Sequence, residues 1–224
     1  MESIVISLGG SVVLSEDIDI SFFNDLKNLF KKISKNYRLY LVIGGGKTAR
    51  TYIKLGRNFN FKENLLDEIG IEITKINAKL IANLFETSNK KIPCSTDEAK
   101  ELKNPIIVMG GTTPGHSTDM VGAELAEKTN ASKFIIATNV DGVYNKDPNK
   151  YKDAKQIKKI SIKKLIDKYG TEWKTAGKSM VIDGPALGII NRAKIPTFVI
   201  NGKKLNELEK AINNQPFKGT VIIN

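Results

Sequence analysis

The stretch Leu39-Tyr40-Leu41-Val42-Ile43-Gly44-Gly45-Gly46-Lys47 indicates the fold class of this chain, because an apolar run ends directly in three glycines. Two further glycine turns follow apolar runs in the same way, Gly9-Gly10-Ser11 after residues 4–8 and Gly110-Gly111 after residues 106–109. A strand that ends in glycine lets its backbone approach a ligand closely, because no Cβ intervenes. If a helix follows, its first N–H groups and the positive end of its dipole face the same point. Three such turns on parallel strands indicate a site for a highly phosphorylated ligand.

Composition narrows the class of protein. A chain of 224 residues is long enough for one large α/β domain with a full core, and its hydrophobic fraction of 41% is typical of globular proteins. No apolar run approaches the ~20 residues of a membrane span, and we expect no signal peptide. The single cysteine, Cys94, excludes an internal disulfide and fits a reducing cytoplasm. The single histidine, His116, argues against zinc chemistry.

The net charge of +11 is carried mainly by lysine. Such a charge attracts anionic substrates or nucleic acid, or it belongs to a solvated lysine-rich surface. We favour the solvated surface, because nucleic-acid readers usually cluster arginine and aromatic residues. The densest basic stretch here, residues 152–164, has only Tyr151 as an aromatic neighbour. We therefore expect no nucleic-acid partner and no membrane partner.

The spacing of apolar residues predicts alternating strands and helices along the whole chain. Strands are expected over residues 4–8, 39–43, 106–109, 133–138, 196–201 and 219–223. Helices are expected over residues 20–34, 48–55, 64–86, 118–128, 162–168 and 205–212, and from the N-cap Asp183 through residue 193. Repeated strand–helix units imply an α/β fold with a mostly parallel sheet covered on both faces.

Familiar phosphate and hydrolase motifs are absent. Gly46-Lys47-Thr48 looks like the tail of a Walker A loop, but Leu41 stands where that loop needs its first glycine. No Gly-x-Gly-x-x-Gly opens a strand–helix unit, which disfavours a dinucleotide fold. The lone His116 lies in a glycine-rich loop with no Gly-x-Ser-x-Gly elbow, which disfavours a hydrolase triad.

Two polar segments remain to be explained. Asp119 starts a predicted helix, where its carboxylate either serves a site beside the glycine loop or is only a helix-start residue, and spacing alone does not separate these interpretations. The segment Thr138-Asn139-Val140-Asp141-Gly142-Val143-Tyr144, followed by Asp147-Pro148, offers hydrogen-bonding groups and a tyrosine ring suited to a nucleoside. The alternative for this segment is an ordinary Asp-Gly turn.

Together these segments resemble the amino-acid kinase superfamily and, within it, the archaeal-type uridylate kinases, over essentially the whole chain. The resemblance is carried by residues 8–12, 42–50, 70–74, 110–119, 138–144 with Asp147-Pro148, and 181–183. It implies an αβα sandwich formed by a single domain over residues 1–224, with an N-terminal acceptor lobe to about residue 130 and a C-terminal ATP lobe from about residue 131. It also implies transfer of the ATP γ-phosphoryl to UMP in pyrimidine nucleotide synthesis, Mg²⁺ held mainly by the ATP phosphates, a cytoplasmic location and a homohexamer.

The resemblance assigns roles to individual residues. It implies that ATP is bound by Gly9, Gly10, Ser11, Gly45, Arg50, Thr138, Asn139, Tyr144 and Asp147. It implies that UMP is bound by Gly44, Asp67, Thr112, Thr113, Pro114, Gly115, His116, Ser117 and Thr118, with Asp67 at the ribose. Asp119 matches the carboxylate that organises phosphoryl transfer, and Lys47 and Arg50 are the best-placed cations against repulsion between the two nucleotides. No protein residue is expected to bind a metal directly.

The chain departs from the family pattern at Ser7. Many superfamily members have lysine at this position, where it contacts the transferring phosphoryl. Lys47 is our expected replacement, and the alternative is that Lys47 is a surface lysine at a helix start. Two other functions stay open: a sibling kinase acting on isopentenyl phosphate, carbamate, aspartate or acetylglutamate, and a non-catalytic oxyanion-storage relative. Retention of Asp119 and Arg50 argues against the storage relative.

Overall fold

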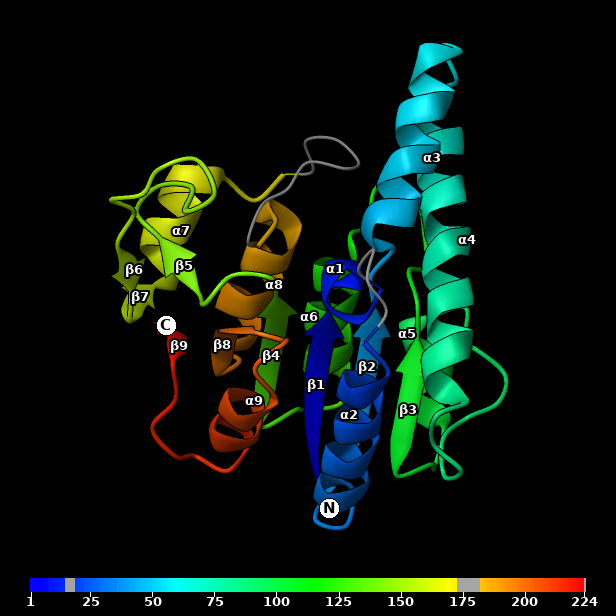
Figure 1. Cartoon of the computed structure of the whole chain (residues 1–224), viewed down its shortest axis with the longest axis vertical. Helices are drawn as coiled ribbons and strands as arrows, with labels where there is room; N and C mark the ends of the chain where they lie inside the picture. Colours follow the sequence, from blue (N-terminus) through cyan, green and yellow to red (C-terminus); the bar gives the residue numbers. More distant parts are fainter. Residues whose placement is uncertain (15–18, 173–181, 224) are drawn as a thin grey trace.

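A seven-stranded sheet forms the centre of the computed structural model, which describes residues 1–14, 19–172 and 182–223 (Figure 1). Its strand order is β3-β2-β1-β4-β8-β9-β7. The strands are β1 (Glu2–Leu8), β2 (Tyr37–Ile43), β3 (Ile106–Met109), β4 (Lys133–Thr138), β7 (Lys159–Ser161), β8 (Thr197–Asn201) and β9 (Gly219–Ile223), and β5 (Val143–Tyr144) pairs separately with β6 (Gln156–Ile157). The strands from β3 to β8 in this order are parallel, whereas β9 is antiparallel to β8 and parallel to β7. The prediction of a mostly parallel sheet is confirmed.

Side chains of the central strands alternate between two hydrophobic cores, because successive residues of a strand point to opposite faces of the sheet. In β1, Ile4, Ile6 and Leu8 join one core and Val5 joins the other. The helices α2 (Ile20–Ile33), α4 (Glu63–Ala82) and α9 (Leu205–Ile212) cover the first face. The helices α5 (Thr96–Glu101), α6 (Thr118–Lys128), α7 (Ile162–Tyr169) and α8 (Gly184–Ala193) cover the second. The fold is therefore the expected αβα sandwich.

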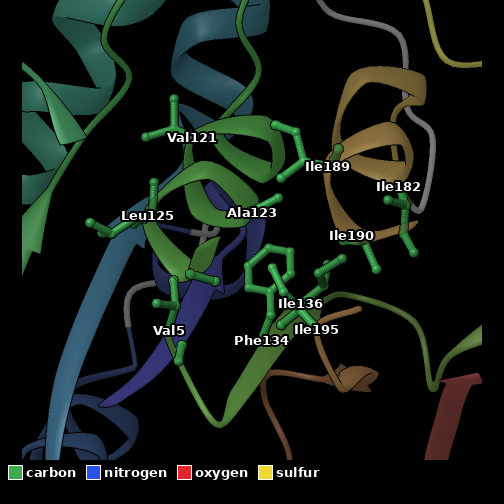
Figure 2. Packing of buried hydrophobic residues seen from close by; sticks show 14 of the residues in the cluster. Val5, Val121, Ala123, Leu125, Phe134, Ile136, Ile182, Ile189, Ile190 and Ile195 are labelled. Atoms are coloured by element: carbon green, nitrogen blue, oxygen red, sulfur yellow. The ribbon is translucent and has the colours of Figure 1, made fainter. Parts of the chain in front are cut away.

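The second core fixes where α6 begins. Figure 2 shows Val121, Ala123 and Leu125 of α6 gathered with Phe134 and Ile136 of β4, and with Ile189 and Ile190 of α8 beside them. At Gly122 in the same helix, an added Cβ would lie 2.7 Å from the Phe134 ring. Since α6 packs this closely on the sheet, its N-terminus is held at the edge where β1 and β4 end.

The helices α3 (Gly46–Asn58) and α4 run side by side and extend past the sheet (Figure 1). Ile53 of α3 packs on Leu66 of α4, and both are buried. The same pair, together with the connection between the two helices, leaves large apolar side chains exposed: Tyr52, Leu55, Phe59, Phe61, Leu65, Ile76 and Leu80. We call these seven residues the α3–α4 apolar face.

Several element boundaries correct the prediction. The helix predicted over residues 64–86 ends at Ala82, and the prediction is wrong at that end. The Asn83 side-chain amide donates to the carbonyl of Lys79 (2.7 Å), which satisfies a carbonyl of the last turn, and Leu84 then packs on the core from outside the helix. No prediction covered α1 (Gly10–Val13), α5 or the strands β5 to β7, which are too short to show a period. Of the quoted segment 181–183, Val181 lies outside the described residues.

Candidate active site

A cavity of about 340 Å³ opens where β1, β2 and β4 end. It is lined by Gly9, Gly10, Ser11, Gly44, Gly45, Gly46, Arg50, Thr118, Asp119, Ile136, Ala137, Thr138 and Asn139. The chain runs from β1 outward to β2 and β3 and then returns to β4 on the other side of β1, and open α/β sheets bind ligands in the crevice at such a reversal of strand order. Four segments that the sequence singled out therefore meet in one cavity.

The first two glycine turns are in direct backbone contact. A Cβ on Gly10 would lie 2.1 Å from the backbone nitrogen of Gly46, and one on Gly44 would lie 2.7 Å from that of Gly10. Gly46 also has φ of +67°, a conformation that glycine adopts without strain. Because α3 starts at Gly46, the N–H groups of its first turn lie at the cavity, which is an arrangement that favours anions.

Asp119 lies in the first turn of α6 and lines this cavity. The Ser7 hydroxyl donates a hydrogen bond of 2.6 Å to Asp119 Oδ1 from the neighbouring strand β1. Burial, and then the negative charge of Asp183, raise the pKa of Asp119 to about 7, while the hydrogen bond from Ser7 opposes this shift. A carboxyl group whose pKa is displaced this far is frequent in functional sites.

The N-termini of α6 and α8 are joined by their cap residues. Ser117 Oγ accepts the N–H of Met120 (2.9 Å) and donates to Asp183 Oδ2. Asp183 Oδ1 accepts the N–H of Ala186 (2.9 Å), so the predicted N-cap of α8 is confirmed. Burial raises the pKa of Asp183, and these hydrogen bonds together with the neighbouring His116 oppose the shift. Two carboxyl groups, Asp119 and Asp183, thus lie close enough to influence each other.

Helix α4 holds the third glycine turn and the loop after it. Asp67 Oδ2 accepts the backbone N–H of Gly115 (2.7 Å), and Gly115 has φ of +81°. Thr74 Oγ1 accepts the N–H of Gly111 and donates to the carbonyl of Ile71, each over 2.6 Å. Of the predicted UMP residues, Gly44 and Thr118 line the cavity, and Thr112, Thr113, Pro114, Gly115, His116 and Ser117 form the adjoining loop. The Nδ1 atom of His116 is buried with no hydrogen-bond partner among the described residues.

The two predicted cations differ in position. Arg50 lines the cavity from α3, whereas Lys47 is exposed in the first turn of the same helix and is not among the described residues that line it. Of the predicted nucleoside segment, Thr138 and Asn139 line the cavity. Tyr144 lies in β5, and Asp147 accepts the N–H of Asn149 in a turn, both outside that lining.

Asp141 anchors the same nucleoside segment to the sheet. Its Oδ1 accepts hydrogen bonds from Lys204 Nζ (2.7 Å) and Asn201 Nδ2 (3.0 Å), and its Oδ2 pairs with Lys218 Nζ at 2.9 Å. Burial alone raises the pKa of Asp141, but the hydrogen bonds from its three partners outweigh burial and hold the pKa well below its usual value. This carboxylate therefore fixes the turn after β4 to the ends of β8 and β9.

Sequence reasoning assigned no role in the site to four residues that hold it together. These are Ser7, noted only as a departure from the family pattern, Thr74, noted only within the segment 70–74, Asn77, and Asp183, predicted only as a helix cap. Asn77 is buried, and its amide donates to the carbonyl of Gly44 (2.9 Å). Thr74 and Asn77 lie three residues apart on the buried side of α4, so polar residues within an apolar helix stripe were the available signal.

The fold and its cavity define an α/β protein with a glycine-lined crevice at the ends of its parallel strands, an arrangement that suits a phosphorylated ligand. The model of the amino acid kinase family matches residues 2–201, and the chain belongs to this family. It is 46% identical to a uridylate kinase of Methanocaldococcus jannaschii over 98% of both chains. It is 42% identical to a uridylate kinase of Thermoplasma volcanium, over 96% of this chain and 95% of that one.

Solved structures agree with this assignment. The crystal structure of uridylate kinase from Archaeoglobus fulgidus has a TM-score of 0.85 at 38% identity, over 99% of this chain and 100% of that one. The crystal structure of UMP kinase from Ureaplasma parvum has a TM-score of 0.79 at 26% identity, over 100% of this chain and 99% of that one. Within the described ranges, no helix is long and apolar enough to cross a membrane.

Proposed function

We propose that this protein is a UMP kinase that transfers the γ-phosphoryl group of ATP to UMP and releases UDP and ADP. One observation carries the proposal: residues predicted for ATP, residues predicted for UMP and Asp119 meet in a single cavity. The similarity to uridylate kinases over nearly the full length of both chains supports the same reaction. The product places the enzyme in pyrimidine nucleotide synthesis.

The chemistry requires two anions to meet in line. Phosphoryl transfer needs little covalent help from the protein, so positioning and charge neutralisation supply most of the catalysis. The glycine turns bring backbone N–H groups to the phosphates, and Arg50 brings a positive charge to the same cavity. We assign the turn at residues 9–11 with Thr138 and Asn139 to ATP, and Gly44, Asp67 and the loop 112–118 to UMP. On this proposal the acceptor lobe ends near residue 130, and the ATP lobe follows.

We expect Mg²⁺ to enter with ATP, held mainly by phosphate oxygens. In the part of the chain that the structure describes, no group of three or more His, Cys, Asp and Glu side chains could hold a metal ion. An ion that binds largely through substrate phosphates needs few ligands from the protein. When bound, Mg²⁺ neutralises phosphate charge, while Arg50 and the first turn of α3 orient the same groups.

We further propose that the enzyme is a cytoplasmic homo-oligomer, with the hexamer as the assembly that the family resemblance implies. The α3–α4 apolar face supports association of copies, because it exposes seven large apolar side chains on one helix pair and its connection, and exposed apolar surface marks interaction sites. Leu55 and Phe59 are 54% and 66% exposed in the single chain. Light scattering of Leu55→Glu and Phe59→Glu should show smaller particles than the wild type, and an unchanged mass would reject this face.

A coupled assay of ADP release tests the proposed activity directly. UMP should be phosphorylated well above CMP, AMP and isopentenyl phosphate, with Asp119→Asn as the inactive control. Equal or better turnover of isopentenyl phosphate would assign the chain to a sibling kinase. No turnover with any acceptor, together with binding of a metal-oxide cluster, would indicate the oxyanion-storage relative.

A further inference from the structure

Ser7 is the buried polar residue of β1, next to the last residue of that strand. It is 1% exposed and pairs in register with Val42 of β2 and Ile136 of β4, which are both buried and apolar. A buried hydroxyl between apolar neighbours is unfavourable unless it is hydrogen-bonded. Among the described residues, its hydroxyl donates to Asp119 Oδ1 at 2.6 Å. The distance is typical of a strong hydrogen bond from a hydroxyl to an ionised carboxylate.

The side chain of Ser7 faces helix α6. Odd-numbered residues of β1 face α6, as Val5 in the second core shows. An added Cβ on Gly122 would lie 3.6 Å from Ser7 Cβ, an ordinary contact distance, so α6 lies directly against the strand at this point. At this spacing between β1 and α6, the hydroxyl of a serine on the strand reaches the first turn of the helix.

Few charged groups face Asp119 from the surrounding elements. Asp183 lies at the start of α8, His116 in the loop before α6, and Arg50 on α3 at the same cavity. On α5, Asp97 faces α6 and forms an ion pair with Lys128, which lies at the C-terminal end of α6, away from Asp119. No described cation makes an ion pair with Asp119, so the Ser7 hydroxyl is the donor that stabilises its charged form.

We propose that Ser7 is a positioning residue: its hydroxyl fixes Asp119 Oδ1 and keeps this carboxylate ionised and aimed at the phosphoryl-transfer site. The role of this contact in phosphoryl transfer rests on the proposed kinase activity, whereas the hydrogen bond between Ser7 and Asp119 does not depend on it. A neutral donor thus stands at the position where the family resemblance leads us to expect a lysine. Ser7 orients the Asp119 carboxylate but supplies no positive charge. We expect Arg50 and the Mg²⁺ that enters with ATP to supply that charge.

The first experiment compares Ser7→Ala with the wild type in kcat and KM between pH 5.5 and 9.5. A hydrogen bond to a charged group contributes roughly 1.5–3 kcal/mol, which corresponds to about tenfold or more in an equilibrium. We therefore expect kcat at pH 7 to fall about tenfold and the acid limb of the profile to move up by about one pH unit. At pH 9.5 kcat should recover toward the wild-type value, and both KM values should stay within about twofold.

Matched variants separate positioning from packing. Ser7→Thr keeps the hydroxyl and should restore the wild-type profile. Ser3→Ala removes a partly buried hydroxyl from the same face of β1 and should change neither the profile nor kcat. A Ser7→Ala profile that coincides with the wild type, or a drop of equal size at every pH, would overturn the proposal.

A second measurement needs no activity. The carboxyl carbons of the full-length protein are followed by ¹³C NMR titration without nucleotides, with Asp119→Asn to identify the Asp119 signal. Ser7→Ala should raise the titration midpoint of that signal by about one pH unit, and Ser3→Ala should leave it in place. An unchanged midpoint would reject the role of Ser7 even if the chain proves to act on another substrate. A raised midpoint in a protein that does not phosphorylate UMP would reject the proposed function alone.

Discussion

Ser117 Oγ donates a hydrogen bond to Asp183 Oδ2, so the residue that caps α6 is bound to the residue that caps α8. Each of these two residues also accepts a backbone N–H from the helix that it caps. The pair therefore sets the relative position of the two helix starts. Because Asp119 lies in the first turn of α6, this contact also sets how strongly the charge of Asp183 acts on Asp119.

Replacing Asp183 by asparagine should make Asp119 easier to ionise. Asparagine is as good an N-cap as aspartate, so α8 should be retained while the negative charge is lost. The second-largest cause that raises the pKa of Asp119 is then removed, and its pKa should fall. NMR titration of the Asp119 carboxyl checks the shift. Asp19→Asn, at the cap of α2, is the control and should leave this titration unchanged; an Asp119 midpoint that does not move in Asp183→Asn would contradict the coupling.

Asp119→Asn should lower activity and change the pH dependence of stability. Loss of this electrostatic group should reduce kcat by on the order of 10²-fold or more. Because its pKa is raised to about 7 in the folded protein, the native state holds more protons than the unfolded state between about pH 4 and 7. The stability contributed by Asp119 is therefore present at low pH and lost as pH rises through about 7.

The amide at position 119 cannot titrate, so the free energy of unfolding of Asp119→Asn should depend less on pH over this range. Its stability relative to the wild type should be higher at pH 8 than at pH 5. Denaturant unfolding at both pH values measures the difference, with Asp97→Asn, an exposed carboxylate next to the same helix, as control. Near-normal kcat together with a parallel pH dependence would reduce Asp119 to a helix-start residue.

The repeated strand–helix pattern was sufficient to predict the fold, because each long element has its own apolar period. Strand β3 and helix α6 have the bounds expected from the sequence. The turns whose glycines meet, Gly10 and Gly46, were recognisable since no other residue tolerates such a close approach. The contact between Ser7 and Asp119 was not predictable, because it joins residues 112 positions apart and depends on how closely α6 packs on β1.

Asp141→Asn should destabilise the protein at neutral pH. The folded-state pKa of Asp141 is depressed, so its stabilising contribution is present above the unfolded value of about 3.9 and is lost as pH falls below it. We expect a loss of about 1–2 kcal/mol at pH 7, because its lysine partners are partly exposed. The difference should shrink as pH falls below about 4. Asp153→Asn, in an exposed pair with Lys146, should have little effect, and equal losses for both variants would contradict the anchoring role of Asp141.

Gly10→Ala and Gly70→Ala should have opposite effects. A Cβ at Gly10 would collide with the backbone of Gly46, so this variant should lose nucleotide binding and several kcal/mol of stability, the scale of a severely strained site. A Cβ at Gly70 would meet only Ile53 Cδ1 at 3.4 Å, and alanine is favoured over glycine inside a helix by roughly 0.5–1 kcal/mol. Thermal unfolding and ATP titration check both variants. A Gly10→Ala protein that binds ATP normally would rule out the close contact of the two turns.

Asp67→Ala should weaken discrimination between UMP and dUMP. Asp67 Oδ2 is occupied by the N–H of Gly115, and a carboxylate has further acceptor sites for the two hydroxyls of a ribose, of which dUMP offers only one. Charge-assisted hydrogen bonds of this kind contribute roughly 1.5–3 kcal/mol each. The KM for UMP should therefore rise tenfold or more, while the KM for ATP changes little.

If the substitution only releases the Gly115 loop, the KM for UMP and the KM for dUMP should rise by the same factor. If it removes ribose recognition, the KM for UMP should rise more than the KM for dUMP. The ratio of the two KM values therefore separates the two effects. Glu68→Ala, at the exposed neighbouring carboxylate that accepts from Asn64, is the control and should leave both KM values unchanged. If Asp67→Ala raises both KM values and keeps the wild-type ratio, Asp67 acts on the loop and not on the ribose.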